Sequence, residues 1–214
     1  MRRLVHHRPR QPGFTLFEML LVLALLVALL ALTFPTLARL QVEHQLKQGA
    51  ELVRLEITST RLHALESGMD YQFRFEPGGT HFIAVPAEYQ AIQAQATAAQ
   101  NNPGGTPAAV YWKAEGEFQV KVKFSADTSK LFGNQTLLQQ PPAQPLPPEF
   151  LTGFKNVAKL TSLAWSPPLI FKPDGSTQDF SVEIEDEKGA YVVLEVRGIT
   201  GGTQLSQILR RVRG

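Results

Sequence analysis

The feature that most constrains this chain is a run of 20 uncharged residues from Met19 to Ala38. Between Met19 and Phe34 every residue except Thr33 is apolar. At about 1.5 Å of rise per residue, a helix of about 20 residues crosses the hydrocarbon core of a bilayer. The run therefore predicts a helix that lies in a membrane.

The residues that flank this run indicate its orientation. Residues 1–13 contain four arginines and no acidic residue, and the positive-inside rule predicts that they stay in the cytoplasm. A cleaved secretory signal is one alternative, but its apolar region normally spans about 7–15 residues and ends in small residues. Here the run is longer, and Phe34 and Pro35 stand where small residues are expected. An uncleaved signal anchor remains an alternative.

A short motif, Gly13-Phe14-Thr15-Leu16-Phe17-Glu18, separates the basic segment from the apolar run. A carboxylate within a membrane helix costs about 2.5–3.5 kcal/mol at the helix centre, so Glu18 is a candidate functional residue. The basic segment, the glycine, the aromatic residue after it, the glutamate and the long apolar helix together resemble the type IV prepilin class. That class includes the pseudopilins of type II secretion.

The resemblance implies a specific route of maturation and assembly. A prepilin peptidase would cut after Gly13, removing residues 1–13, and the new amine of Phe14 would be N-methylated. Glu18 would form an assembly salt bridge with the amine of a neighbouring subunit, and Pro35 would kink the helix. The chain would cross the bacterial inner (cytoplasmic) membrane once, with its C-terminal domain in the periplasm, and join a filament. Its partners would be the peptidase, other pilin or pseudopilin subunits, an inner-membrane assembly platform and membrane lipid.

Beyond Pro35 the pattern predicts that the helix continues to about Ser67. Apolar residues recur on one face at spacings of three, four and seven: Leu46, Ala50, Val53, Ile57 and Ala64. The opposite face carries Glu43, Lys47, Glu51, Arg54 and Arg61, and Gly68 supplies the stop. We therefore divide the helix into a transmembrane half, 14–35, and an amphipathic extracytoplasmic half, 36–68.

From Tyr71 the apolar residues alternate with polar ones, which predicts β-strands in a globular domain at 69–214. Residues 71–75 and 82–85 flank a Pro-Gly-Gly turn and read as a hairpin. Residues 118–124 read as one half-buried strand, and 169–171 and 180–184 flank a Pro-Asp-Gly-Ser turn that reads as another hairpin. The expected fold class is α+β: a type IV pilin-like long N-terminal helix packed on an antiparallel β-sheet domain.

Two stretches of this domain do not read as core. Residues 87–107 hold six alanines and four glutamines, and residues 125–150 include five prolines within Gln139 to Pro148. Such compositions bury little apolar surface, so we expect loop insertions at 87–107 and 125–150.

A second, less specific resemblance covers about residues 46–86 and 165–204. The segment Ile170-Phe-Lys-Pro-Asp-Gly-Ser, then Gly189 to Val196, then Thr200-Gly201, is similar to the terminal segment of the H-type minor pseudopilins and related minor pilins. The resemblance implies a minor subunit of a secretion pseudopilus or pilus-like filament.

Signatures of catalysis and metal binding were sought without success. The chain has no cysteine, no phosphate-cradling G-x-x-x-x-G-K-[ST] and no G-x-S-x-G, and its five histidines are scattered. The best calcium candidates are Asp174, Asp179, Glu183, Glu185, Asp186 and Glu187. A hairpin turn explains Asp174, and the outward face of a strand explains Glu183 and Glu185, so the structural interpretation is favoured over a metal site. The basic tail, Arg210, Arg211 and Arg213, is either solvated or in contact with a phosphate or lipid head group. We expect no enzyme activity, cofactor, metal or nucleic-acid partner.

Two function classes therefore compete. The first is a minor pilin or pseudopilin, a structural subunit. The second is a binding module: a signal-anchored periplasmic β-domain that holds a ligand with its proline- and glutamine-rich loops. The N-terminus of the mature chain discriminates between them, because only the first predicts a chain that begins at Phe14.

Overall fold

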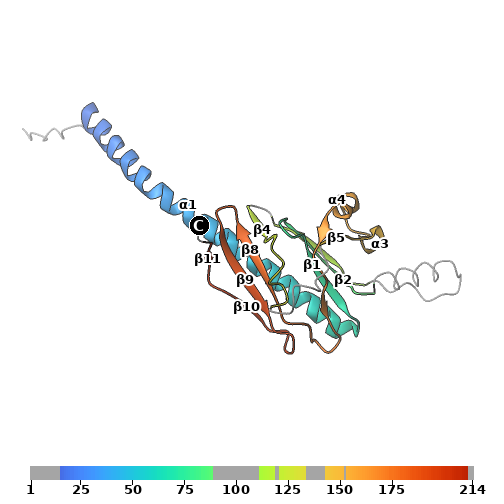
Figure 1. Ribbon diagram of the computed structural model, residues 1–214. Coiled ribbons are helices and arrows are strands. Elements are labelled where there is room, and N and C mark those ends of the chain that lie inside the picture. Colours follow the sequence, from blue (N-terminus) through green and yellow to red (C-terminus); the bar gives the residue numbers. More distant parts are fainter. Residues whose placement is uncertain (1–14, 89–110, 119–120, 134–142, 152, 212–214) are drawn as a thin grey trace, which may run out of the picture. The chain divides into compact units, whose positions relative to one another are not determined.

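A computed structural model covers the 214-residue chain and describes residues 15–88, 111–118, 121–133, 143–151 and 153–211, without the side chains at 32–42 and 149. The chain divides into two compact units, Met1–Val42 and Glu43–Gly214. One helix, α1 (Leu16–Ser67), contributes to both units (Figure 1). Each unit is described by itself below.

The α1 helix ends where the sequence predicts. Gly68 has a φ of +70° and its amide donates to the carbonyl of Ala64, which is the geometry of a glycine C-cap. In the second unit, five apolar residues of α1 are at most 1% exposed: Leu46, Ala50, Val53, Ile57 and Ala64. These are the residues that the sequence places on the apolar face, so that prediction is confirmed.

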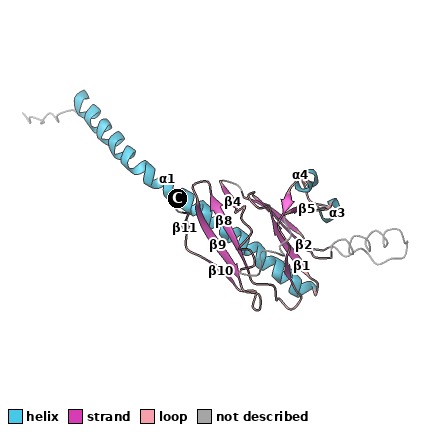
Figure 2. Cartoon of the chain, in the orientation of Figure 1, coloured by secondary structure: helices cyan, strands magenta, loops and turns pink. Residues whose placement is uncertain are grey.

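The other described residues of the second unit form antiparallel strands and two short helices (Figures 1 and 2). The first sheet has the order β3-β2-β1-β7, with β1 (Tyr71–Phe75), β2 (His81–Pro86), β3 (Ala114–Glu117) and β7 (Leu169–Phe171). The second has the order β10-β9-β8-β4, with β11 also on β9: β4 (Val122–Phe124), β8 (Phe180–Asp186), β9 (Ala190–Val196), β10 (Thr203–Leu205) and β11 (Leu209–Arg210). A ribbon of β5 (Gln144–Pro145) and β6 (Ala164–Trp165), with α3 (Pro148–Leu151) and α4 (Val157–Thr161), completes the fold.

Two hydrophobic cores hold these layers together. The larger core joins the apolar face of α1 to both main sheets, and it includes Phe73, Phe124 and Leu194, none of which is exposed. The smaller core lies on the other side of β2, where Ile83 and Val85 pack with Leu151 and other residues of the β5, α3, α4 and β6 region. Because β2 contributes to both cores, all six of its residues are buried. The α+β class with antiparallel sheets is confirmed.

The predicted hairpin at 71–85 is confirmed, since β1 and β2 pair antiparallel with Tyr71 opposite Pro86 and Phe75 opposite Phe82. The predicted single strand at 118–124 is wrong. The chain leaves the first sheet after Glu117 and enters the second at Val122, with Lys121 at a φ of 45° between them. Phe118 and Phe124 still face the same core, so the alternation was read correctly but the break was not.

The second predicted hairpin is also wrong. The Pro-Asp-Gly-Ser turn forms, with Gly175 at a φ of +77°, but β7 belongs to the first sheet and β8 to the second. The turn therefore passes the chain from one sheet to the other. Local turn chemistry specifies a reversal of direction, whereas the partner of each strand depends on the whole fold.

The stretch 125–150 is not simply a loop insertion. Leu131 belongs to the larger core and is 2% exposed, while Leu146 belongs to the smaller core and is 5% exposed. Prolines are tolerated on edge strands and in the first turn of a helix, which is where Pro145 of β5 and Pro148 of α3 lie. The insertion predicted at 87–107 falls mostly outside the described residues.

Candidate functional site

The described part of the motif begins at Thr15, immediately before α1. The Thr15 side-chain oxygen accepts a hydrogen bond from the amide of Glu18 at 3.2 Å, and the Thr15 carbonyl accepts one from the amide of Met19 at 3.2 Å. Thr15 is therefore the N-cap of α1 and Glu18 is its third helical residue. This Thr-x-x-Glu spacing is typical of a capping box, and sequence reasoning missed it although the signal was present.

The Glu18 carboxylate lies in the first turn of α1, where the helix dipole favours a negative charge by about 0.3–1 kcal/mol. Of the two hydrogen bonds of a capping box, the described residues show the one from the Glu18 amide to the Thr15 side chain and none from the Thr15 amide to the Glu18 carboxylate. The sites predicted next to it, Gly13 and Phe14, lie outside the described residues. The pairing role of Glu18 stays a prediction.

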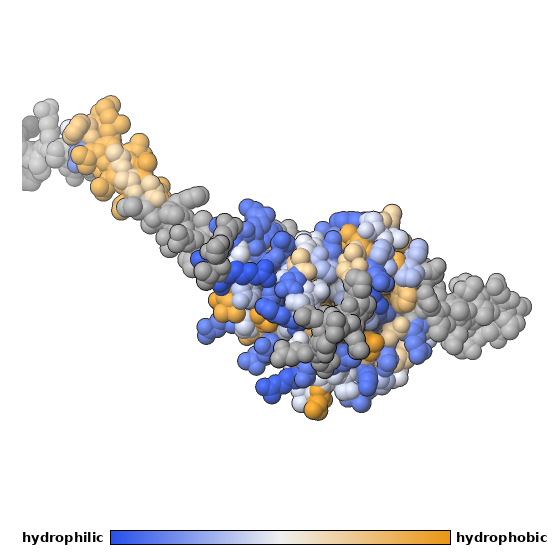
Figure 3. Space-filling view, in the orientation of Figure 1, coloured by the Kyte–Doolittle hydropathy of each residue, from blue (hydrophilic) through white to orange (hydrophobic). Residues whose placement is uncertain are grey.

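The first turns of α1 are apolar on every side. The large apolar side chains between Leu16 and Leu30 are each 46–80% exposed, with Phe17 at 74% (Figure 3). A helix that is apolar all round is normally buried in protein or in lipid. Among the residues that the structure describes, no helix meets the length and apolarity required to span a membrane.

The kink predicted at Pro35 remains untested. Residue 35 is assigned to α1, but its side chain is among those outside the description. The two units that α1 connects are described separately, so no bend is assigned.

Five of the six calcium candidates form hydrogen bonds or ion pairs within the protein. Asp174 accepts from the amide of Ser176 at 2.8 Å, and hydrogen bonds with the side chain and then the amide of Ser176 lower the pKa of its carboxyl. Asp179 accepts from the amide of Gly198, and Asp186 accepts from the amides of Lys188 and Ala190, both at 2.8 Å. No group of three or more potential metal ligands occurs within the described residues.

Glu183 and Glu185 belong to an ion-pair network on the outer face of the second sheet. Arg211 contacts Glu183 at 2.8 Å and Glu185 at 3.0 Å, and it lies over the ring of Tyr191 at 5.5 Å. The hydrogen bond to Glu183 is the main cause that raises the pKa of the guanidinium. Arg210 pairs with Glu43 of α1 at 3.1 Å. These two arginines of the tail are thus paired with the domain, while Arg213 lies outside the described residues.

Sequence reasoning placed Arg61 on the solvent face of α1, but in the structure Arg61 contacts two turns, one at Gly175 and one at Gly201. We call this contact the clasp. Its Nε donates to the carbonyl of Gly175 at 2.9 Å, across 114 positions in the chain. A Cβ on Gly175 would lie 3.1 Å from the guanidinium, and one on Gly201 would overlap Nε of Arg61. Both glycines have positive φ. The Pro-Asp-Gly-Ser turn and the Thr200-Gly201 turn therefore converge on one helix residue.

The histidines that the structure describes do not form a common site. His63 stacks on Trp112 with ring centroids 4.0 Å apart, and His81 lies 3.3 Å from the carboxylate of Glu117, which also contacts Lys159 at 3.3 Å. Glu56 is the one polar side chain in the described part with a buried oxygen that lacks a partner, and burial raises the pKa of its carboxyl.

Comparisons with known proteins place the start of the chain in a recognised class of sequence. Residues 8–34 match the family model described as the prokaryotic N-terminal methylation motif. Searches of curated proteins and of solved structures each returned no match. The matched residues include Gly13, Phe14, Thr15 and Glu18, so the chain carries the type IV prepilin-like motif that marks substrates of prepilin peptidase and subunits of membrane-anchored filaments.

Proposed function

We propose that this protein is a minor pilin or pseudopilin, a structural subunit of a type II secretion pseudopilus or a type IV pilus-like filament. The observation that carries the proposal is the methylation motif at 8–34, which ends within the apolar first half of a 52-residue helix. The second half of that helix is part of the core of a domain with antiparallel sheets. This division of one helix between an apolar N-terminal segment and a folded domain suits a subunit that assembles through its N-terminus.

Maturation begins in the proposed scheme with cleavage after Gly13, which leaves Phe14 as an N-methylated first residue. The residues from 14 to 35 lie in the bacterial inner membrane, and the domain faces the periplasm until the subunit enters the filament through its helix and the assembly platform. Residues 1–13 contain four arginines and residues 14–35 contain none, and this distribution of charge favours the orientation. The role is structural, and no step of it requires a cofactor.

Glu18 directs assembly in this scheme. A carboxylate in lipid costs about 2.5–3.5 kcal/mol at the helix centre, which exceeds the dipole contribution of about 0.3–1 kcal/mol. A cation must supply the difference, and the amine of Phe14 on a neighbouring subunit is the proposed partner. The Thr15 cap supports this role because it fixes Glu18 in the first turn of α1, close in sequence to the proposed new N-terminus.

The domain supports the finer assignment to the H-type minor subunits. The Pro-Asp-Gly-Ser turn and the Thr200-Gly201 turn, which carry that resemblance, both contact Arg61 of α1. Their shared role explains why two distant motifs occur together in one sequence. We propose that they fix the two sheets to the end of the helix.

Two variants test the proposal. Gly13→Leu should remain uncut, because the peptidase must approach the backbone closely before Phe14. Glu18→Ala should be cut as in the wild type and should insert in membranes at least as well, yet it should fail to co-assemble with the other subunits. Processing is read from electrophoretic mobility and co-assembly from cross-linking in membranes. Normal cleavage of Gly13→Leu, or normal assembly of Glu18→Ala, would refute the corresponding step.

A further inference from the structure

We propose that the end of the domain from which the N-terminal helix emerges is a docking surface for anionic phospholipid head groups. The surface is formed by six cations, here called the basic end: Lys47, Lys121, Lys123, Lys188, Arg210 and Arg211. The proposal rests on the proposed function only in assuming that the apolar segment at 14–35 enters a bilayer.

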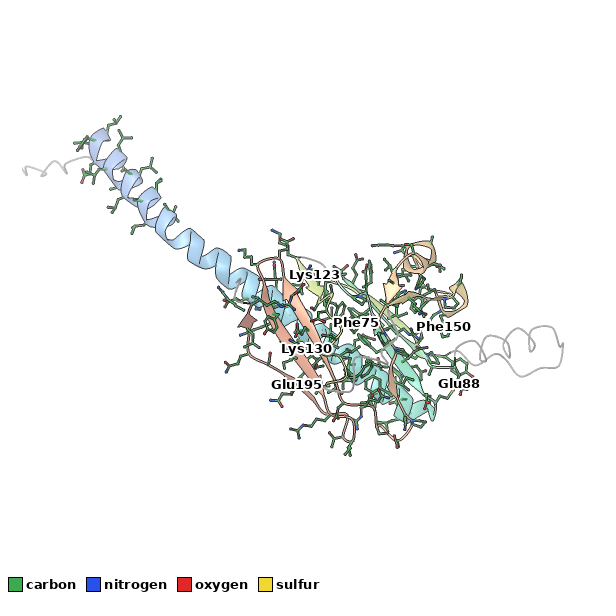
Figure 4. The ribbon with its side chains drawn as sticks, in the orientation of Figure 1. Phe75, Glu88, Lys123, Lys130, Phe150 and Glu195 are labelled. Carbon is green, nitrogen blue, oxygen red and sulfur yellow. The ribbon has the colours of Figure 1, made fainter. Side chains whose placement is uncertain are left out.

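Strand register places these cations together. In the second sheet Val122 lies opposite Asp186, and Arg210 lies opposite Ala190, so β4 begins, β8 ends and β9 begins at one end of the sheet. The Arg211 amide donates to the carbonyl of Gly189, in the turn that follows Lys188. Figure 4 shows Lys123 at the upper end of the sheets and Glu195 toward the opposite end.

The same end of the sheet meets the start of the domain part of α1. Arg210 pairs with Glu43 at 3.1 Å, and Glu43 is the first residue of the second unit. Val122 lies 3.1 Å from the position that a Cβ on Gly49 would occupy. Lys47 therefore shares this end with the lysines that flank Val122, and Figure 3 shows hydrophilic residues over it.

The charge of this end differs from that of the rest of the unit. The six cations share it with five acidic residues, Glu43, Glu183, Glu185, Asp186 and Glu187, which leaves a formal charge of +1. Residues 43–214 as a whole contain 16 Lys or Arg and 18 Asp or Glu, so the remainder carries −3. A polarised domain of this kind orients toward an anionic surface with its positive end.

Three of the cations are available for an external partner. Lys47, Lys121 and Lys188 are exposed, and none of them forms an ion pair with the residues that the structure describes. Lys123, Arg210 and Arg211 are paired internally, so they hold the surface together while the free lysines give it a net positive field. Leu209, which is 43% exposed beside the two arginines, adds an apolar contact for the interfacial region.

The segment that separates Lys47 from the apolar run is short in sequence. Lys47 follows the last uncharged residue of the apolar run, Ala38, by nine residues. Nine residues of helix span about 13 Å, which is comparable with the Debye length of about 8–10 Å at physiological salt. An anionic surface at the end of the apolar run would therefore act on the free lysines.

The test uses the full chain, which has no native cysteine, with a single spin label at Gln207→Cys near the basic end. The chain is placed in nanodiscs of phosphatidylcholine alone or with about one third phosphatidylglycerol, and the accessibility of the label to a water-soluble nickel complex is measured. We expect lower accessibility in the anionic discs and recovery at high salt. A label at Ile199→Cys, which replaces a side chain that is 93% exposed, should not respond.

Charge variants identify the surface. Replacing Lys47, Lys121 and Lys188 by glutamine should abolish the protection, since each lysine near an anionic surface changes the docked-to-free ratio about fivefold. The matched control replaces Lys155, Lys172 and Arg197 by glutamine, which removes the same charge away from the basic end. Equal accessibility in both lipids, or an equal effect of the control variant, would overturn the proposal.

Two further arms separate the alternatives. Inorganic phosphate added to neutral discs should have no effect, and protection by phosphate alone would replace the lipid surface with a phosphate site and overturn the proposal. A label at Leu25→Cys reports on the anchor. If that label is accessible to nickel in both lipids, the proposed membrane insertion fails, whereas a shielded Leu25 label with an unresponsive Gln207 label refutes only the docking surface.

Discussion

Substitution of Gly201 by alanine tests the clasp between α1 and the two turns. Gly201 has a φ of +60°, which costs a residue with a Cβ about 1–2 kcal/mol. The added Cβ would also displace Arg61 and break its hydrogen bond to the carbonyl of Gly175, a charged-donor bond that is worth about 1.5–3 kcal/mol. We therefore expect Gly201→Ala to lower the free energy of unfolding by about 3–5 kcal/mol, or Tm by about 10 °C for a domain of this size.

The assay is thermal unfolding of the full chain in detergent, followed by the fluorescence of Trp112 and Trp165, which are the two tryptophans of the sequence. The matched control is Gly133→Ala, because Gly133 also has a positive φ of +63° but no atom lies within 4 Å of its added Cβ. The control should lose only the part of the unfolding free energy that comes from placing a Cβ at a positive φ, about 1–2 kcal/mol. In an Arg61→Ala background the Gly201 substitution should become as mild as the control. An equal loss for both glycines in the wild-type background would refute the clasp.

Three further substitutions probe other parts of the domain. Leu151→Ala should cost about 2–5 kcal/mol because the side chain is 0% exposed in the smaller core, whereas a loss under about 0.5 kcal/mol by denaturant titration would mean that this region is a loop. Glu56→Gln should raise Tm more at pH 7 than at pH 4. Burial raises the pKa of Glu56 in the folded state, so the ionised carboxylate destabilises the fold at pH values above the pKa of the unfolded chain. An equal rise in Tm at both pH values would contradict this. Arg211→Ala should cost about 1 kcal/mol by leaving Glu183 and Glu185 without their shared cation, and the loss should shrink at high salt in parallel denaturant titrations.

The periodicity of the sequence predicted local structure well where one face of an element enters a core. The alternation in residues 71–85 gave the β1–β2 hairpin, and the spacing of Leu46, Ala50, Val53, Ile57 and Ala64 gave the buried face of α1. The same alternation could not show that the chain changes sheets between Phe118 and Phe124. A period of two shows which face of a strand is apolar, and the apolar residues before and after the break enter the same core.

The role of Arg61 could not be predicted because it depends on turns more than 100 residues away. A charged residue opposite an apolar stripe normally lies in solvent, and only the fold brings Gly175 and Gly201 to it. The proline-rich stretch misled for a related reason, since single apolar residues such as Leu146 anchor it in a core. By contrast, the hydrogen bond from the Glu18 amide to the Thr15 side chain could have been predicted from the Thr-x-x-Glu spacing.

The measurement that tests the central claim most directly is the N-terminus of the chain purified from membranes of its native host. Intact mass and N-terminal sequencing should find a chain that begins at Phe14 and carries one methyl group on its amine. A Gly13→Leu chain purified in parallel should retain its basic segment, which shows that the cut depends on the glycine. A wild-type chain that still begins with residues 1–13, or one that is cut well inside the run from Met19 to Ala38, would contradict the account.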